Sequence, residues 1–237
     1  MIWEDLKVYR PLPKEDLKAA YKDFTKIVSE NLLLDGFETR GRKLIKLSND
    51  LFHIVHLDTR GSWMGVSDSF KTEISIGTIY DIVTFVLNYE LTGSKRIEEI
   101  IPKIRNYYRI TEEYKLLADF ITRKIRESII PYFSHFQTSK DILSNRGMFK
   151  IDNMSEITER NSNLILYCEL ANKVDVASSE ILTAKLNKLK RLNAKDSTIN
   201  EIVELRNLVQ EKDWDKIGEK LLNNKQQVLK KLKFKEN

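Results

Sequence analysis

The chain has 237 residues, of which 41% are apolar and 32% charged, a composition typical of a globular protein with a sizeable hydrophobic core. No apolar run approaches the roughly 18 residues that cross a bilayer, and the N-terminus lacks the apolar stretch of a signal peptide. The single cysteine, Cys168, excludes an internal disulfide framework. We therefore expect a cytoplasmic protein without a membrane partner.

The net charge of +5 is concentrated in the C-terminal part of the chain. Residues 185–237 carry 14 Lys or Arg and 8 Asp or Glu, whereas residues 1–184 carry 26 and 27. The basic character thus belongs to the C-terminal quarter. This distribution argues against a nucleic-acid binder that uses the whole surface, but it leaves room for a basic patch at one end.

The first predicted element is a helix over residues 14–34, because its apolar residues recur at helical spacing and Asp35-Gly36 supplies a stop signal. Residues 37–47 and 51–59 predict two strands joined by a Ser-Asn-Asp turn, which together form a hairpin. Residues 70–78 predict a third strand whose alternation gives one buried and one solvated face.

The next segment mixes short elements. Residues 79–89 fit either a helix or a strand. Residues 94–104 predict a short helix and residues 107–110 a short strand. Thr111 is expected to cap a long helix, which Pro131 should kink or restart.

Residues 144–163 are polar and irregular, and we place the domain boundary there. Beyond this stretch, apolar stripes predict helices over residues 164–173, 177–192, 197–211 and 214–232. The expected fold class is α+β, with three or four antiparallel strands packed on helices and an all-helical C-terminal subdomain. The expected domains are residues 1–150 and 160–237.

The side chains that could carry chemistry are few. His53 and His56 are three apart on a strand, so they face opposite sides and cannot share an ion; one should be half-buried and the other exposed. Asp58, Asp68 and Glu73 are interpreted as solvated charges. The sequence therefore predicts no metal site and no cofactor.

The sequence also predicts no catalytic residue. It contains neither a glycine loop that cradles phosphate nor a nucleophile elbow. Cys168 lies in an apolar helical stretch, where a buried and inert thiol is expected. An enzyme of unrecognised class remains an alternative, because active sites can be built from residues that one sequence does not reveal.

The predicted partner-binding surface is the hairpin and the loop that follows it. Arg40, Arg42 and Arg60 cluster in sequence around Trp63, and Arg and Trp are the residue types that most often anchor interfaces. In the competing interpretation, Trp63 folds back onto the core.

A second possible surface lies in the basic C-terminal helices. Its candidate residues are Lys188, Lys190, Arg191, Lys230 and Lys231. These cations could bind the phosphates of a nucleic acid. The competing interpretation is a solvated helix face, because acidic residues are interspersed and stacking aromatics are sparse.

The segments GFETRGRKLIKLSNDLFHIVHLDTRG and FKTEISIG, after a leading amphipathic helix, resemble the bacterial family catalogued as domain of unknown function 4304. Residues 125–142 resemble the closing helix of that family, so the resemblance covers roughly residues 14–145. The chain departs from the family pattern at Asp58, where the family usually has Gln. The resemblance implies a helix-plus-antiparallel-sheet fold and supplies no catalytic residues.

Together these observations predict a non-catalytic protein-binding module of a bacterial cytoplasmic protein. A toxin-neutralising immunity protein, or a subunit of a defence or regulatory complex, would fit that class. The alternatives are a nucleic-acid-binding accessory protein that uses the basic C-terminal helices, and an enzyme of unrecognised class.

Overall fold

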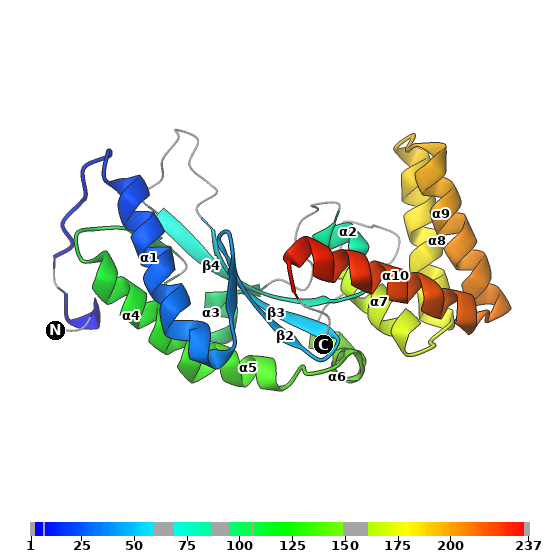
Figure 1. Ribbon diagram of the computed structural model, residues 1–237, viewed down its shortest axis with the longest axis horizontal. Coiled ribbons are helices and arrows are strands. Elements are labelled where there is room, and N and C mark those ends of the chain that lie inside the picture. The colour runs from blue at the N-terminus through cyan, green and yellow to red at the C-terminus, as the bar shows by residue number, and fades with distance from the viewer. Residues whose placement is uncertain are drawn as a thin grey trace. The chain divides into compact units, whose positions relative to one another are not determined.

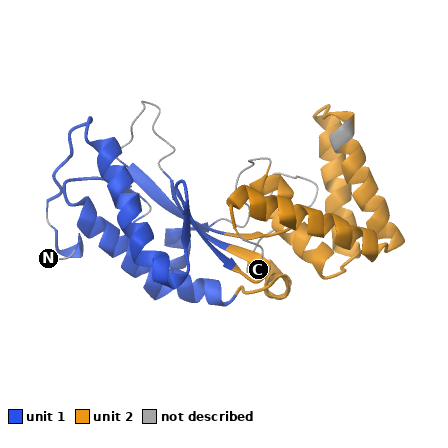
Figure 2. Cartoon of the chain, viewed as in Figure 1, with its two compact units in different colours: residues 1–47, 53–75, 95–135 blue, residues 48–52, 76–94, 136–237 orange. Residues whose placement is uncertain are grey.

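The computed structural model describes residues 3–6, 8–58, 69–86, 95–105, 107–148 and 161–234. Within these ranges the fold is α+β, an antiparallel sheet with helices and a helical C-terminal region (Figure 1). The chain divides into two compact units (Figure 2). Unit 1 comprises residues 1–47, 53–75 and 95–135, and unit 2 comprises residues 48–52, 76–94 and 136–237. The predicted boundary near residues 150–160 lies outside the described residues, so that domain division stays a prediction.

The sheet has the strand order β1-β2-β3-β4-β5, and β6 pairs with β4. The strands are β1 (Glu38–Arg40), β2 (Lys43–Ser48), β3 (Leu51–Asp58), β4 (Ser69–Thr78), β5 (Lys95–Arg96) and β6 (Tyr108–Arg109). The described residues thus hold six strands rather than the expected three or four. The predicted strand over residues 37–47 divides because Gly41, at a φ of +64°, turns the chain between β1 and β2. The strands β5 and β6 have two residues each, too few to leave a periodic pattern.

The hairpin of β2 and β3 follows the prediction, whereas the alternation of β4 does so only in its first half, because Ile74–Thr78 are all buried and the predicted solvated face ends at Glu73. Asn49 takes a φ of 51° in the turn between β2 and β3. Along β4, Phe70, Thr72 and Ile74 are buried, whereas Lys71 and Glu73 are partly exposed. The strand β3 differs from a half-buried strand, because all eight of its residues are buried.

In unit 1, the helices α1 (Leu17–Leu32) and α4 (Tyr114–Lys124) pack along each other over one face of the sheet (Figure 1). The ring centroids of Phe24 in α1 and Phe70 in β4 are 4.8 Å apart. The hydroxyl of Tyr21 donates a hydrogen bond of 2.6 Å to the carbonyl of Leu57, which ties α1 to β3. The 3-10 turn η2 (Leu33–Asp35) ends the first helix, and Gly36 takes the predicted left-handed conformation at a φ of 85°.

The long middle helix is interrupted before its proline, as predicted. After α4 the chain makes a π-helical turn, η3 (Ile125–Ile129), and Pro131 lies in the first turn of α5 (Ile130–Ser134). The predicted cap was wrong, because α4 begins at Tyr114 and the Thr111 hydroxyl instead donates to the Glu113 carboxylate at 2.9 Å.

The short helices are η1 (Trp3–Asp5), α2 (Ile82–Phe85), α3 (Ile97–Ile100), α6 (Ser139–Ser144) and η4 (Arg146–Met148). The ambiguous segment over residues 79–89 is helical in α2, where the buried Asp81 side chain caps the helix by accepting a 3.0 Å hydrogen bond from the Thr84 backbone N–H. Residues 87–89 of this segment lie outside the described part of the chain.

Unit 2 ends in the four predicted helices, α7 (Ser162–Ala171), α8 (Val176–Arg191), α9 (Asp196–Glu211) and α10 (Trp214–Leu232). The stripe predicted for α10 is buried at Ile217, Leu221 and Val228. None of the described helices combines the length and the apolar character that crossing a membrane requires.

Replacing Gly77 by alanine is expected to destabilise unit 2 by about 1–3 kcal/mol through overpacking. A Cβ at this position would lie 2.5 Å from Cζ of Phe85, and that ring is confined at its edge by Phe52. Thermal or urea unfolding measures the cost, and Phe85→Leu should recover part of it in the double variant. Gly218 in α10 is the matched control because no atom would meet its Cβ. Gly218→Ala should stabilise the protein by up to about 1 kcal/mol, and equal costs at the two glycines would contradict the packing explanation.

Candidate functional site

A cluster of ionisable side chains lies on the face of the sheet opposite α1 and α4. It contains His56 and Asp58 from β3 and Lys71 and Glu73 from β4. Residues two apart on a strand share a face, so each strand contributes a pair, and adjacency of the strands brings the pairs together. We call these four residues the sheet cluster.

Short ionic contacts connect the sheet cluster. The Lys71 ammonium lies 2.6 Å from Oε1 of Glu73 and 3.8 Å from Oδ2 of Asp58. Nδ1 of His56 lies 3.7 Å from Oε2 of Glu73, too far for a hydrogen bond. The His56 imidazole, followed by the Lys71 ammonium, lowers the pKa of Glu73 from its ordinary 4.5 to about 2, against the opposing effect of burial. Glu73 is therefore ionised at neutral pH.

Three sequence expectations are corrected or sharpened here. His53 and His56 do face opposite sides, because His53 stacks on Phe133 of α5 with 4.4 Å between ring centroids. Neither is exposed, however, since their exposed fractions are 2% and 6%. Asp58 is 2% exposed rather than solvated, the Glu73 side chain is only 13% exposed, and Asp68 lies outside the described residues. The missing information was the register between β3 and β4, which a single sequence does not supply.

The depressed pKa of Glu73 predicts acid sensitivity. A carboxyl whose pKa is lower in the folded than in the unfolded chain stabilises the fold above its unfolded pKa. This contribution, at most about 3 kcal/mol, should be present above about pH 4.5 and be lost as the pH falls towards 2. The check is the free energy of unfolding of the native protein and of Glu73→Gln between pH 7 and pH 2.5. The difference in free energy of unfolding between the native protein and Glu73→Gln should become smaller as the pH falls. A difference that stays constant would show that the Glu73 charge does not stabilise the fold.

A second feature of unit 1 is an aromatic cleft of about 730 Å³ beside β6. Its aromatic and charged lining consists of Trp3, Tyr9, Arg105, Tyr107, Tyr108 and Arg109. We call these residues the aromatic cleft.

Ring contacts shape the aromatic cleft. The rings of Trp3 and Tyr9 are 4.6 Å apart between centroids, and the Arg105 guanidinium lies 5.9 Å from the centre of the Tyr9 ring. The Tyr107 side chain is exposed, whereas burial of Tyr108 raises the pKa of its hydroxyl to about 12. The cleft therefore presents the exposed Tyr107 ring and the half-buried Tyr9 ring beside two cations, whereas Trp3 and Tyr108 are buried.

Sequence reasoning missed the aromatic cleft because its residues come from distant segments. Trp3 and Tyr9 precede the first predicted helix, and the others lie between residues 105 and 109. The isolated bridge between Pro11 and Thr111 brings these segments together. The Tyr-Tyr-Arg run at Tyr107–Arg109 was the one local signal of this surface.

The predicted hairpin surface is described only in part. Arg40 forms an ion pair of 2.7 Å with Glu38 within β1, and the Arg42 guanidinium lies 5.7 Å from the centre of the Tyr21 ring. Arg60 and Trp63 lie outside the described residues. The structure thus gives internal contacts to two of the four residues, and the surface as a whole stays a prediction.

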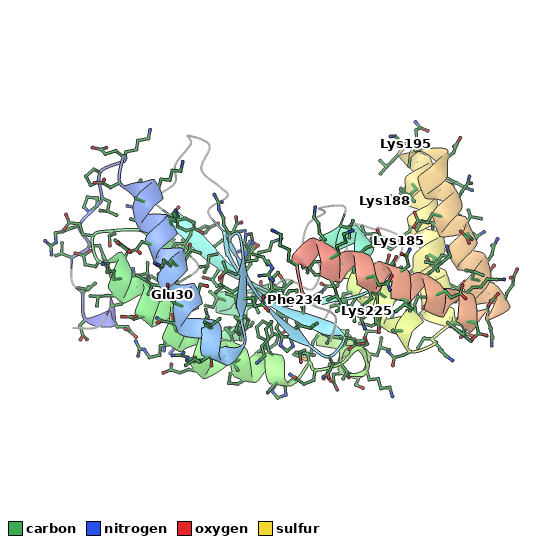
Figure 3. All side chains as sticks on the ribbon, viewed as in Figure 1. Glu30, Lys185, Lys188, Lys195, Lys225 and Phe234 are labelled. Atoms are coloured by element: carbon green, nitrogen blue, oxygen red, sulfur yellow. The ribbon has the colours of Figure 1, made fainter. Side chains whose placement is uncertain are left out.

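The candidate nucleic-acid residues fall in the last turns of two helices. Lys188, Lys190 and Arg191 are at the end of α8, and Lys230 and Lys231 are at the end of α10, positions where cations interact favourably with the helix dipole. Figure 3 shows Lys185 and Lys188 spaced along α8, with Lys195 beyond its end.

Cys168 of α7 is buried in unit 2, as the sequence predicts. Burial raises the pKa of its thiol, so the thiolate form is disfavoured. A nucleophilic role for this cysteine has no support in its surroundings.

Comparison of the chain with family models, curated proteins and solved structures found no match.

Proposed function

We propose that this chain is a non-catalytic binding protein that recognises another protein, and that the aromatic cleft takes up an acidic, apolar segment of that partner. The observation that carries the proposal is the composition of the cleft, whose lining combines four aromatic side chains with two exposed arginines. Aromatic and arginine side chains are the types that dominate the binding energy of protein interfaces.

The aromatic part of the cleft supports an apolar contact. Trp3 and Tyr9 pack against each other, so their rings are held in place before a partner arrives. An exposed ring with two side-chain torsions loses little conformational entropy on binding and can bury a large apolar area against a partner. Tyr107, which is 53% exposed, offers the accessible ring of the set.

The charged part of the cleft favours an acidic partner. Arg105 and Arg109 are the charged residues of the described lining, and both are exposed. A guanidinium presents its donors in a planar fork that matches a carboxylate, and it also stacks on aromatic rings. An extended segment that carries both carboxylates and apolar side chains complements this surface.

Within this class, we propose an immunity protein that neutralises a toxin, or a subunit of a defence or regulatory complex, in the bacterial cytoplasm. The resemblance of residues 14–145 to domain of unknown function 4304 is part of the same proposal. A toxin gene beside the gene for this chain would favour the immunity role, and occurrence in unrelated gene contexts would count against it.

Mapping the partner contact tests the cleft directly. The protein with a photo-reactive p-benzoylphenylalanine at Tyr107 is used to capture partners in the native cell, and the cross-linked peptides are identified by mass spectrometry. The expected product is one dominant partner, joined through a segment rich in acidic and apolar residues.

Charge-reversed variants provide the matched comparison. Arg105→Glu with Arg109→Glu should weaken binding of the identified partner at least about tenfold, whereas Lys230→Glu with Lys231→Glu reverses as many charges outside the cleft and should leave binding unchanged. Loss of binding in the lysine variant alone, or capture of nucleic acid that weakens steeply with salt, would overturn the cleft proposal.

A further inference from the structure

The sheet cluster offers three ligand atoms of the kinds that bind transition metals. One nitrogen of His56 and one oxygen each of Asp58 and Glu73 lie within 4.8 Å of one another. All three side chains stand on paired strands of the sheet, which fixes their spacing better than a loop would. Tetrahedral bonds of about 2.0–2.1 Å place ligand atoms about 3.3 Å apart, so small side-chain rotations suffice to close the set around an ion.

His56 carries the independent observation. Its side chain is 8% exposed, and Nδ1 has no hydrogen-bond partner in the part of the chain that the structure describes. A buried polar atom left without a partner is costly and requires an explanation. Nδ1 faces the sheet cluster, 3.7 Å from Oε2 of the Glu73 carboxylate, so it is placed to act as a nitrogen ligand together with the two carboxylates.

Lys71 already places a positive charge at this position. Its ammonium lies between the carboxylates of Glu73 and Asp58, at 2.6 and 3.8 Å. The lysine side chain is 23% exposed and has a flexible stem, so the ammonium can swing towards solvent. The arginine opposite Glu73 on β5, Arg96, lies 3.8 Å from Glu98 and is thus paired away from the cluster.

We propose that His56, Asp58 and Glu73 bind one divalent transition-metal ion such as Zn²⁺, and that the ion displaces the Lys71 ammonium. One imidazole and two carboxylates form a mixed nitrogen and oxygen set that suits Zn²⁺ better than Mg²⁺. Three protein ligands leave a fourth position for water or for a ligand group from a partner. This site is independent of the aromatic cleft and of the function proposed for it.

The test measures Zn²⁺ binding to the full chain after treatment with a chelator, by isothermal titration and by elemental analysis after dialysis. One ion per chain is expected for the native protein. Glu73→Gln and His56→Gln should each weaken binding at least about tenfold, since loss of even an outer-shell partner has that effect. His135→Gln is the control because His135 is exposed and outside the cluster, and it should bind as the native protein does.

Lys71→Met distinguishes lost binding from a damaged fold. The Lys71 ammonium is a positive charge within about 4 Å of the Asp58 and Glu73 carboxylates, and it competes with the ion for them. Removing it should tighten Zn²⁺ binding at least about fivefold. A misfolded variant cannot produce that gain. The proposal is overturned by any of four results: no bound Zn²⁺, unchanged affinity in Glu73→Gln, loss of binding in His135→Gln, or equal or weaker binding in Lys71→Met.

Discussion

Replacing Phe24 by alanine is expected to lower the free energy of unfolding by about 3–5 kcal/mol. The ring of Phe24 is fully buried, and its centroid lies 4.8 Å from that of Phe70 and 6.2 Å from that of Tyr21. Truncation removes the main contact between α1 and the sheet and leaves a cavity that the backbone of two packed elements cannot close. Urea unfolding followed by circular dichroism measures the change.

The control for this variant lies on the same helix. Lys22 is exposed two residues earlier, so Lys22→Ala should change the stability by less than about 0.5 kcal/mol. Similar small losses in both variants would contradict the assignment of Phe24 to the centre of the interface between α1 and the sheet.

Replacing Arg146 by methionine is expected to destabilise unit 2 by about 2–4 kcal/mol at neutral pH. The Glu169 carboxylate of α7 is 1% exposed, and its charged partner is the Arg146 guanidinium at 2.7 Å. The hydroxyl of Ser178 donates a weaker hydrogen bond of 3.3 Å to the same carboxylate. Without Arg146, the buried carboxylate loses its counterion and must either stay charged in an apolar site or take up a proton, and both states are unfavourable at pH 7. The estimate lies below that for a fully buried pair because Arg146 is 39% exposed.

The pH dependence and a double variant identify the cause. Burial raises the pKa of Glu169 above its ordinary value, and Arg146 opposes that shift. When the pKa of a carboxyl is higher in the folded than in the unfolded chain, the folded protein becomes more stable as the pH falls, because the folded state takes up the proton more readily. The deficit of Arg146→Met should therefore shrink between pH 7 and pH 5, and Glu169→Gln should relieve it at pH 7. If the loss of stability depended neither on pH nor on the Glu169→Gln substitution, it would come from lost packing of Arg146 and not from an unpaired charge.

Most of the fold was predictable because long elements leave strong patterns. The stripes of α1 and α10 and the alternation of β4 identify these elements within three residues of their bounds. The two-residue strands β5 and β6 carry no such pattern, and they take their conformation from pairing with β4. The division of the first strand depended on the local conformation of Gly41.

The candidate sites were less predictable because they depend on tertiary contacts. Alternation along β4 predicts that Lys71 and Glu73 lie on one face. Their contacts with His56 and Asp58 depend on the register between β3 and β4, which alternation does not predict. The aromatic cleft combines residues about a hundred positions apart, and no local spacing relates Tyr9 to Tyr107.

The central claim is that this chain binds a partner protein through the aromatic cleft, and a calorimetric titration tests it most directly. The partner identified by cross-linking is titrated into the native protein and into Arg105→Glu with Arg109→Glu, after unfolding curves have shown that the two proteins are equally stable. We predict that the dissociation constant rises at least about tenfold in the variant. An unchanged dissociation constant would contradict the claim and direct the search for the binding surface elsewhere on the chain.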